Sequence, residues 1–406
     1  MGSEILRSAS IRSQQWPSKK SKKSEPSSSA EVSDCEAEGH LSHSFVSSRE
    51  IESSGLTNEL RVFVGTWNVA GKSPVGSLVA DLDEWLHQKS SVDMYVLGFQ
   101  EIVPLNTMSV IGMEDYTEPR KWNLLIGKTL NNKEGSIWLT PTMTPIINDD
   151  YQYRKPSNSE GQTGLRRSTT PLRERPKTQH GEEHGSACSY SLMASKKLVG
   201  VFITIWMKRE LLKKYRVSNV KACTVACGLM GYLGNKGAVS VSMSIEGTSF
   251  CFITAHLASG EKKGDEGRRN QQVVEIFKRT NFPRFSMEND GSLPSTITGH
   301  DRIFWFGDLN YRLYMKDKIA RELIRKKNWK ELQKFDQLKK EQEQGVFQGW
   351  KEGDIEFAPT YKYSVELGNH YTGDKHAPFA PNTGEKRRTP AWYAFGSIAL
   401  SFCLPA

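Results

Sequence analysis

The sequence predicts an α/β sandwich, a fold in which β-sheets form the centre and helices cover them. Segments rich in β-branched and aromatic residues are grouped along the chain, and segments with helical periodicity stand around them. Hydrophobic residues make up 37% of the 406 residues and charged residues 25%, as in globular proteins. The length allows one large domain or two ordinary ones.

The first part of the predicted domain contains two strands and a helix. Residues 61–69 (RVFVGTWNV) are typical of a strand because they are β-branched and aromatic. Residues 78–86 have the pattern of an amphipathic helix. Residues 93–99 (DMYVLGF) predict a second, buried strand.

Strand segments dominate from residue 188 onward. The predicted strands are Ser191–Met207, Val217–Cys227, Ala238–Ile245, Phe250–His256 and Asp301–Phe306. The predicted helical stretches are Glu266–Arg279 and Asp317–Glu343.

Two segments lack the pattern of a packed domain. Residues 1–58 are rich in Ser, Lys and Glu and predict a disordered N-terminal tail. Its basic run at residues 19–23 fits a nuclear signal, a membrane-surface contact or a solvated tail. Residues 149–187 contain Pro, Ser, Gly and Arg and predict a flexible basic surface insertion within the domain.

The net charge of +9, from 55 basic and 46 acidic residues, favours an anionic partner. Nucleic acid, inositol phosphates and anionic lipid surfaces all satisfy this condition. The six cysteines are scattered, and no signal peptide opens the chain. We therefore expect a cytoplasmic protein, with peripheral membrane or nuclear localisation as alternatives.

Polar residues stand at the ends of four predicted strands. Asn68 follows the first predicted strand, and Gln100 and Glu101 follow the second. His256 ends the predicted strand that begins at residue 250. Asp308 and Asn310 follow the strand that ends at residue 306. Strand ends are positions at which a rigid scaffold presents catalytic groups.

The residue types at these positions suit metal-assisted hydrolysis of a phosphate ester. Asp308 and Asn310 are two residues apart and share a face if the strand geometry continues. Glu101 is a hard oxygen ligand of the kind Mg2+ prefers, and His256 can donate a hydrogen bond to a phosphate oxygen. Each residue alone also fits a turn, a solvated loop or a satisfied core position, so the hypothesis depends on their joint occurrence.

Six segments together resemble the successive motifs of the inositol polyphosphate 5-phosphatases, of the endonuclease/exonuclease/phosphatase superfamily. The segments are GTWNVAGK (65–72), GFQEIVPLN (98–106), GYLGNKGAVSVSM (231–243), TAHLASGE (254–261), WFGDLNYRL (305–313) and APTYKY (358–363). The resemblance covers a catalytic domain at residues 59–392. The N-terminal tail and the Arg-rich insertion are similar to those of plant members.

The resemblance implies a DNase I-like, four-layer α/β sandwich with two mixed sheets packed face to face. It implies that Glu101 holds Mg2+ with Asn68 nearby, that Asp308 and Asn310 orient water and the scissile phosphate, and that His256 binds this phosphate. Further residues are implied in substrate binding. Lys236 would contact the 1-phosphate side, and the 4-phosphate would be bound by Tyr361, Lys362, Lys386 and Arg388.

The sequence departs from the family pattern after Trp392. The family continues with Cys-Asp-Arg-Ile and later Ser-Asp-His, whereas residues 393–406 (YAFGSIALSFCLPA) form a divergent apolar tail. We therefore expect the C-terminal strands of the fold to be missing and the form to be truncated or alternatively spliced. The tail either covers part of the resulting gap or promotes aggregation.

These observations predict a magnesium-dependent phosphatase that removes the 5-phosphate from inositol polyphosphates, phosphatidylinositol 4,5-bisphosphate or both. The expected partners are inositol phosphates or phosphoinositide head groups, with peripheral contact to an anionic membrane. The main alternative is a catalytically impaired form that binds inositol phosphates without efficient turnover. A DNase-like nuclease is disfavoured because it has no use for residues that bind a 4-phosphate, and no nucleic-acid partner is expected.

Overall fold

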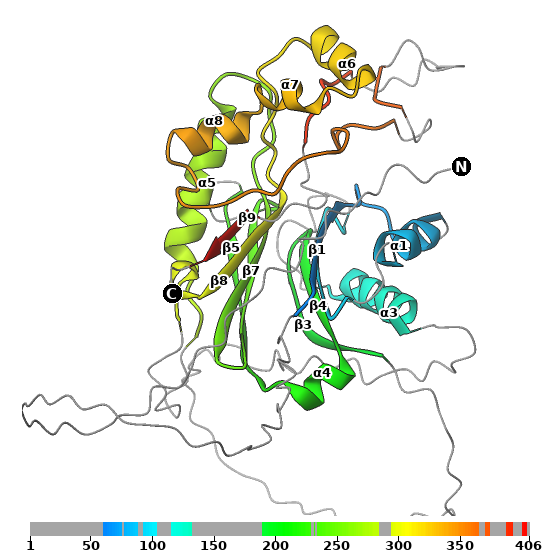
Figure 1. The fold of residues 1–406 in the computed structure, drawn as a ribbon, viewed down its shortest axis with the longest axis vertical. Helices are drawn as coiled ribbons and strands as arrows, with labels where there is room; N and C mark the ends of the chain where they lie inside the picture. Colours follow the sequence, from blue (N-terminus) through cyan, green and yellow to red (C-terminus); the bar gives the residue numbers. More distant parts are fainter. Residues whose placement is uncertain are drawn as a thin grey trace, which may run out of the picture.

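Two mixed β-sheets lie face to face, and helices cover the outer side of each sheet (Figure 1). The computed structural model describes residues 60–74, 77–87, 92–103, 115–131, 189–228, 231, 234–283, 294–364, 370–373, 387–392 and 400–403. The predicted tail at 1–58 and the predicted insertion at 149–187 lie outside these ranges.

The first sheet has four strands in the order β1-β2-β4-β3. Their bounds are Val62–Asn68 for β1, Met94–Gln100 for β2, Tyr190–Leu198 for β3 and Val201–Lys208 for β4. Only β1 and β2 are parallel. Helices α1 (Ser77–His87) and α3 (Thr117–Asn131) cover the outer face of this sheet, and α4 (Arg209–Lys214) leads to the second sheet.

The second sheet has five strands in the order β5-β6-β7-β8-β9. Their bounds are Val217–Ala226, Gly237–Ile245, Thr248–His256, Arg302–Asp308 and Leu400–Cys403. Here β7 and β8 form the parallel pair. The helical elements of this half are α5 (Asp265–Arg279), η1 (Ile297–Gly299), α6 (Asp317–Arg325), α7 (Trp329–Gln333) and α8 (Gln337–Glu343).

Three apolar clusters fill the three interfaces between the four layers. Between α1, α3 and the first sheet lie large aromatic side chains such as Trp85, Phe99 and Trp122. The two sheets meet through aliphatic and aromatic residues such as Val96 and Phe252. Trp305 belongs to the third cluster, which joins the second sheet to α5 and α8. Alternating side chains of the central strands therefore face two different cores, as expected for sheets buried on both sides.

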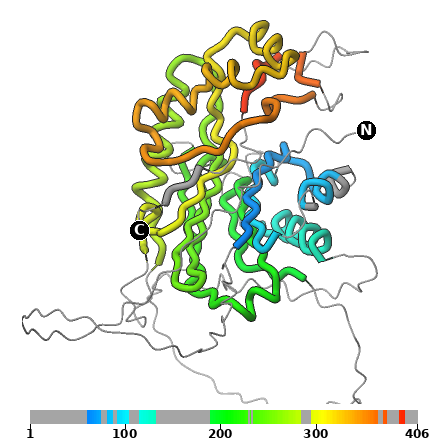
Figure 2. The backbone as a smooth tube through the Cα atoms, viewed as in Figure 1, coloured from blue at the N-terminus to red at the C-terminus, as the bar shows by residue number. Residues whose placement is uncertain are grey.

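The backbone trace shows where the sequence-based boundaries were wrong (Figure 2). The predicted strand 191–207 is a hairpin of β3 and β4, because Val199 adopts a left-handed φ of 50° and turns the chain beside Gly200. The stretch 317–343 is mostly helical, as predicted, and it is divided into three short helices. Helix α3 was not predicted, although its buried face anchors the first sheet.

Part of the divergent tail completes the edge of the second sheet. Leu400–Cys403 forms β9 and pairs antiparallel with β8, from Arg302 opposite Cys403 to Trp305 opposite Leu400. This pairing agrees with the expectation that the tail covers part of the gap, and the alternative, aggregation through the tail, stays a prediction. Residues 393–399 and 404–406 lie outside the described ranges.

In the part of the chain that the structure describes, no helix combines the length and the apolar character needed to cross a bilayer.

Candidate active site

The carboxyl ends of two parallel strand pairs meet at one edge of the sandwich. Parallel register places Asn68 beside Gln100 at the end of β1 and β2, and His256 beside Asp308 at the end of β7 and β8. Strands β1 and β8 face each other across the sheet interface. Four polar side chains that are far apart in the sequence are therefore brought together, as predicted from their strand-end positions.

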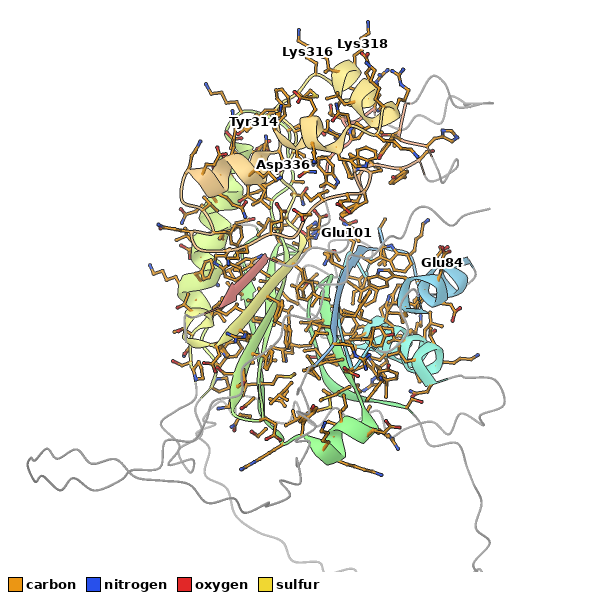
Figure 3. All side chains as sticks on the ribbon, viewed as in Figure 1. Glu84, Glu101, Tyr314, Lys316, Lys318 and Asp336 are labelled. Atoms are coloured by element: carbon orange, nitrogen blue, oxygen red, sulfur yellow. The ribbon has the colours of Figure 1, made fainter. Side chains whose placement is uncertain are left out.

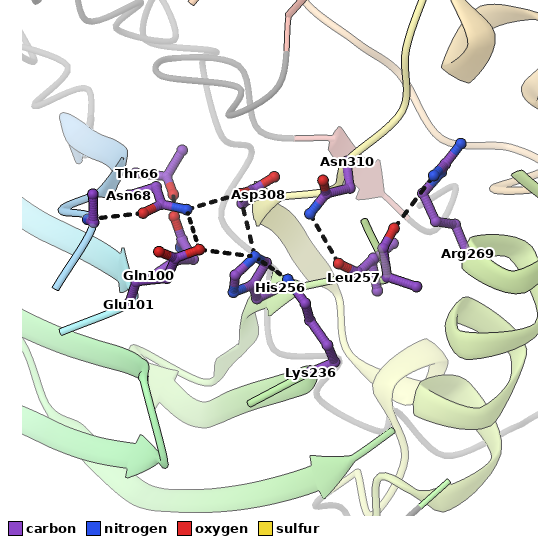
Figure 4. A network of polar contacts seen from close by, with 12 residues as sticks. Thr66, Asn68, Gln100, Glu101, Lys236, His256, Leu257, Arg269, Asp308 and Asn310 are labelled. Carbon is purple, nitrogen blue, oxygen red and sulfur yellow. Dashed lines mark hydrogen bonds and ion pairs between the residues drawn. The ribbon is translucent and has the colours of Figure 1, made fainter. Parts of the chain in front are cut away.

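Asn68 connects the two sheets at this edge (Figure 4). Its Nδ2 donates to Glu101 Oε1 at 3.2 Å and to Asp308 Oδ2 at 2.9 Å. Its side-chain Oδ1 accepts a hydrogen bond from the Ala70 backbone amide at 3.0 Å. The amide group is thus fixed in an orientation that holds two carboxylates close to one another.

His256 lies at the centre of the cluster and is almost fully buried. Its Nε2 is 3.3 Å from Asp308 Oδ2 and 3.9 Å from Glu101 Oε1. Lys236 Nζ contacts the same ring nitrogen. Burial lowers the pKa of Lys236, while the charges of Asp308 and Glu101 act in the opposite direction. Lys236, predicted on the 1-phosphate side, therefore lies among the residues assigned to the scissile phosphate.

Glu101 lies on the open side of the cluster. Its side chain is 29% exposed, compared with 2% for His256 and 0% for Asp308. Its backbone has a left-handed φ of 56°, which is costly for a glutamate and is a type of strain found at functional sites. Figure 3 shows Glu101 at the end of the sheets where β1 and β8 finish.

Gln100, a neighbour of Glu101, connects the sheets below the cluster and is fully buried. Its Nε2 donates to Thr66 Oγ1 at 3.0 Å and to Thr254 Oγ1 at 3.2 Å. Gly98 allows this close approach, because a Cβ at that position would lie 2.3 Å from Thr254 Oγ1. Gln100 therefore stabilises the packing of the two sheets beneath the site.

Asn310 does not share a face with Asp308 in the way that a continued strand predicts. Strand β8 ends at Asp308, and Asn310 has a left-handed φ of 60°. Its Nδ2 donates to the Leu257 carbonyl at 2.9 Å, and its Oδ1 accepts from Arg312 Nη2 at 3.3 Å. The turn after β8 thus directs Asn310 toward the loop that follows β7, as Figure 4 shows.

A basic cluster lies next to Asn310. Arg312 has its guanidinium 4.8 Å from the centre of the Tyr361 ring, and its Nη1 is 3.5 Å from Glu261 Oε1. Glu261 Oε2 also accepts from Arg388 Nη1 at 3.1 Å. Two of the residues predicted to bind the 4-phosphate, Tyr361 and Arg388, are therefore joined through Arg312 and Glu261.

The remaining predicted 4-phosphate residues are placed less fully. Lys362 follows Tyr361 directly, and its carbonyl accepts from the Thr372 backbone amide. Lys386 lies outside the described residues. Arg312 was not among the predicted residues, although it belongs to the WFGDLNYRL segment, two positions after Asn310.

The donor set fits a hard divalent cation held by few protein ligands. Among the described residues, no three His, Cys, Asp or Glu side chains form a ready-made metal cage. Mg2+ is typically held by one or two carboxylates plus water and substrate phosphates. Glu101 is the partly exposed carboxylate here, and the buried Asp308 Oδ1 has no hydrogen-bond partner among the described residues. That Asn68 also acts as a metal ligand stays a prediction.

Comparison with known proteins agrees with this geometry. The family model of the endonuclease/exonuclease/phosphatase family 2 matches residues 65–153 and 176–393. Type I inositol polyphosphate 5-phosphatases 4 and 8 of Arabidopsis thaliana are 40% and 46% identical to this chain. Each match covers 82% of this chain, and it spans 71% and 64% of the length of these two relatives.

Solved structures give the same assignment of the fold. The inositol polyphosphate 5-phosphatase domain of SPsynaptojanin, crystallised with inositol (1,4)-bisphosphate and a calcium ion, is 28% identical and superposes with a TM-score of 0.58. This match covers 84% of the present chain and 76% of that domain. Cimex nitrophorin, at 17% identity and a TM-score of 0.50, shares the fold alone. The present chain therefore belongs to the inositol polyphosphate 5-phosphatases, a family of hydrolases with the DNase I-like fold.

Proposed function

We propose that this chain removes the 5-phosphate from inositol polyphosphates, from the head group of phosphatidylinositol 4,5-bisphosphate, or from both, in a magnesium-dependent reaction. The observation that carries the proposal is the meeting of Asn68, Glu101, His256 and Asp308 at one edge of two sheets. The names of the relatives and the inositol bisphosphate bound by SPsynaptojanin support the substrate class.

In this proposal each side chain has a defined task during hydrolysis. The P–O bond to the ring oxygen breaks as a water oxygen bonds to phosphorus, and the proton lost by the water ends on the ring oxygen, which leaves as a hydroxyl group. Asp308, held by Asn68, orients the attacking water, and His256 donates a hydrogen bond to the scissile phosphate. Lys236 adds positive charge beside His256. Glu101 would hold Mg2+, which would neutralise negative charge on the phosphate when bound.

A second candidate is binding of inositol phosphates without efficient turnover. It rests on residues 393–406, which do not match the Asp-Arg and Asp-His groups expected in the family, and on a family match that ends at residue 393.

Phosphate release by the purified chain separates the two candidates. Inositol 1,4,5-trisphosphate is supplied with Mg2+ or with EDTA, and the chain is compared with a version that carries a family-like sequence after Trp392. Magnesium-dependent release by the natural sequence supports the phosphatase. Binding in calorimetry with release only from the family-like version supports the second candidate. Lipid vesicles with phosphatidylinositol 4,5-bisphosphate, used as substrate, test contact with an anionic membrane.

A further inference from the structure

The loop after β7 places a carboxylate between two arginines of the basic cluster. Glu261 Oε2 accepts from Arg388 Nη1 at 3.1 Å, and Glu261 Oε1 is 3.5 Å from Arg312 Nη1. The three residues come from three separate segments of the chain. One carboxylate thus occupies the space between two guanidinium groups, which is an arrangement that also suits a phosphate.

The guanidinium group of Arg312 is held in place, so any anion that binds between the two arginines has to fit this fixed position. Its side chain is 8% exposed, its Nη2 donates to Asn310 Oδ1 at 3.3 Å, and its guanidinium lies on the Tyr361 ring. A guanidinium in such a position is stabilised by a nearby negative charge. In the structure that charge is supplied by Glu261.

Glu261 itself can leave the bridge by rotation of its side chain. The side chain is 34% exposed, whereas the loop backbone is held in place by the fully buried Arg269, which donates to the carbonyls of Ala258 and Gly260. Displacement of the carboxylate therefore requires no movement of the loop. A phosphate monoester, with more charge and more acceptor oxygens than a carboxylate, is able to take its place.

We propose that Glu261 is a specificity-determining residue: an internal carboxylate that bridges Arg312 and Arg388 and competes with the ring phosphate next to the scissile one. This rests on the proposed function, in which Arg388 binds the 4-phosphate. A ligand with a hydroxyl at that position cannot replace the carboxylate and leaves the bridge closed. A ligand with a phosphate at that ring position displaces the Glu261 carboxylate, and Arg312 and Arg388 then bind the phosphate.

The test is Glu261→Gln, which keeps the shape of the side chain and removes its charge. A partly exposed ion pair is worth about 0.2–1 kcal/mol, so the variant should bind inositol 1,4,5-trisphosphate about 1.4- to 5-fold more tightly. Affinity for inositol 1,5-bisphosphate should change less. Glu322→Gln is the matched control, because Glu322 pairs with Lys326 on the surface of α6. Calorimetry in EDTA measures binding without turnover.

Unchanged or weaker binding of the trisphosphate by Glu261→Gln, or an equal gain for both ligands, overturns the proposal. Glu261→Asp provides a second reading if the first variant does not fold, since its shorter carboxylate should give a smaller gain with the same selectivity. If the unmodified chain binds neither ligand, the proposed function fails together with this inference. If it binds both but releases no phosphate, only the turnover part of the proposed function fails.

Discussion

Replacing Asp308 by Asn should abolish most turnover while leaving the fold intact. Asp308 is fully buried at the end of β8, and its Oδ2 accepts from Asn68 and lies 3.3 Å from His256 Nε2. The variant removes one negative charge and places an amide N–H where an acceptor stood. Asn68 then faces a competing donor, so the orientation of both Asn68 and His256 is lost.

The geometry sets the size of the effect. The buried Asp308 carboxylate accepts a hydrogen bond from Asn68 at 2.9 Å, and its charge acts to raise the pKa of the neighbouring Lys236. Loss of one partner of a buried, hydrogen-bonded charge pair typically costs about 2–5 kcal/mol. If this loss applies to the transition state, the rate of the chemical step falls ~30- to 5,000-fold.

Single-turnover phosphate release from inositol 1,4,5-trisphosphate, with a thermal melt of the same preparation, measures both consequences. Asp301→Asn is the control, because Asp301 precedes the opposite end of β8 and accepts from the Ser249 amide and hydroxyl at 2.9 and 2.7 Å. It should lower stability without a comparable loss of rate. A similar fall in rate for both variants, or an unchanged rate for Asp308→Asn, would refute the assigned role.

Three further predictions concern metal, specificity and pH. Glu101→Ala should remove the thermal stabilisation by Mg2+, and an equal shift of the melting curve in the variant would show that Glu101 is not the ligand. Neutral replacements of Lys362 and Arg388 should weaken calorimetric binding of 4,5-bisphosphorylated ligands more than of ligands without the 4-phosphate, and equal losses would contradict the assignment. Burial raises the pKa of Glu352 to about 8 and that of Asp336 to about 6. The folded chain therefore holds protons that the unfolded chain releases, and stability should fall as pH rises from about 5 to 8. Glu352→Gln should raise the free energy of unfolding at pH 8 by about 1–3 kcal/mol and flatten this dependence, as urea titrations at pH 6 and pH 8 would reveal.

The position of the site could be predicted from the sequence because it depends on strand ends. Asn68, His256 and Asp308 each end an apolar run, and the parallel pairing of these runs brings them to one edge. Pairing itself follows from the strand pattern and the motif resemblance. The four layers were predicted from the resemblance to the family.

The features that were not predicted depend on local turns and on contacts between distant loops. The direction of Asn310 is set by its own left-handed backbone, two residues after the end of β8, and such a turn has no periodicity from which to infer it. The bridge from Arg312 through Glu261 to Arg388 joins residues up to 127 positions apart. The hairpin at Val199 was not predicted because its left-handed turn residue is β-branched, and β-branched residues are typical of strands rather than of turns.

The pairing of β9 with β8 joins the tail to the strand that ends at Asp308. Residues of a strand alternate between its two faces, so a slip of β8 by a single position would turn Asp308 away from Asn68 and His256. Strand β7 holds β8 along one side, and Leu400–Cys403 holds the half of β8 that is distant from Asp308 along the other. The tail therefore adds a second set of backbone hydrogen bonds to those with β7 that fix the register of β8.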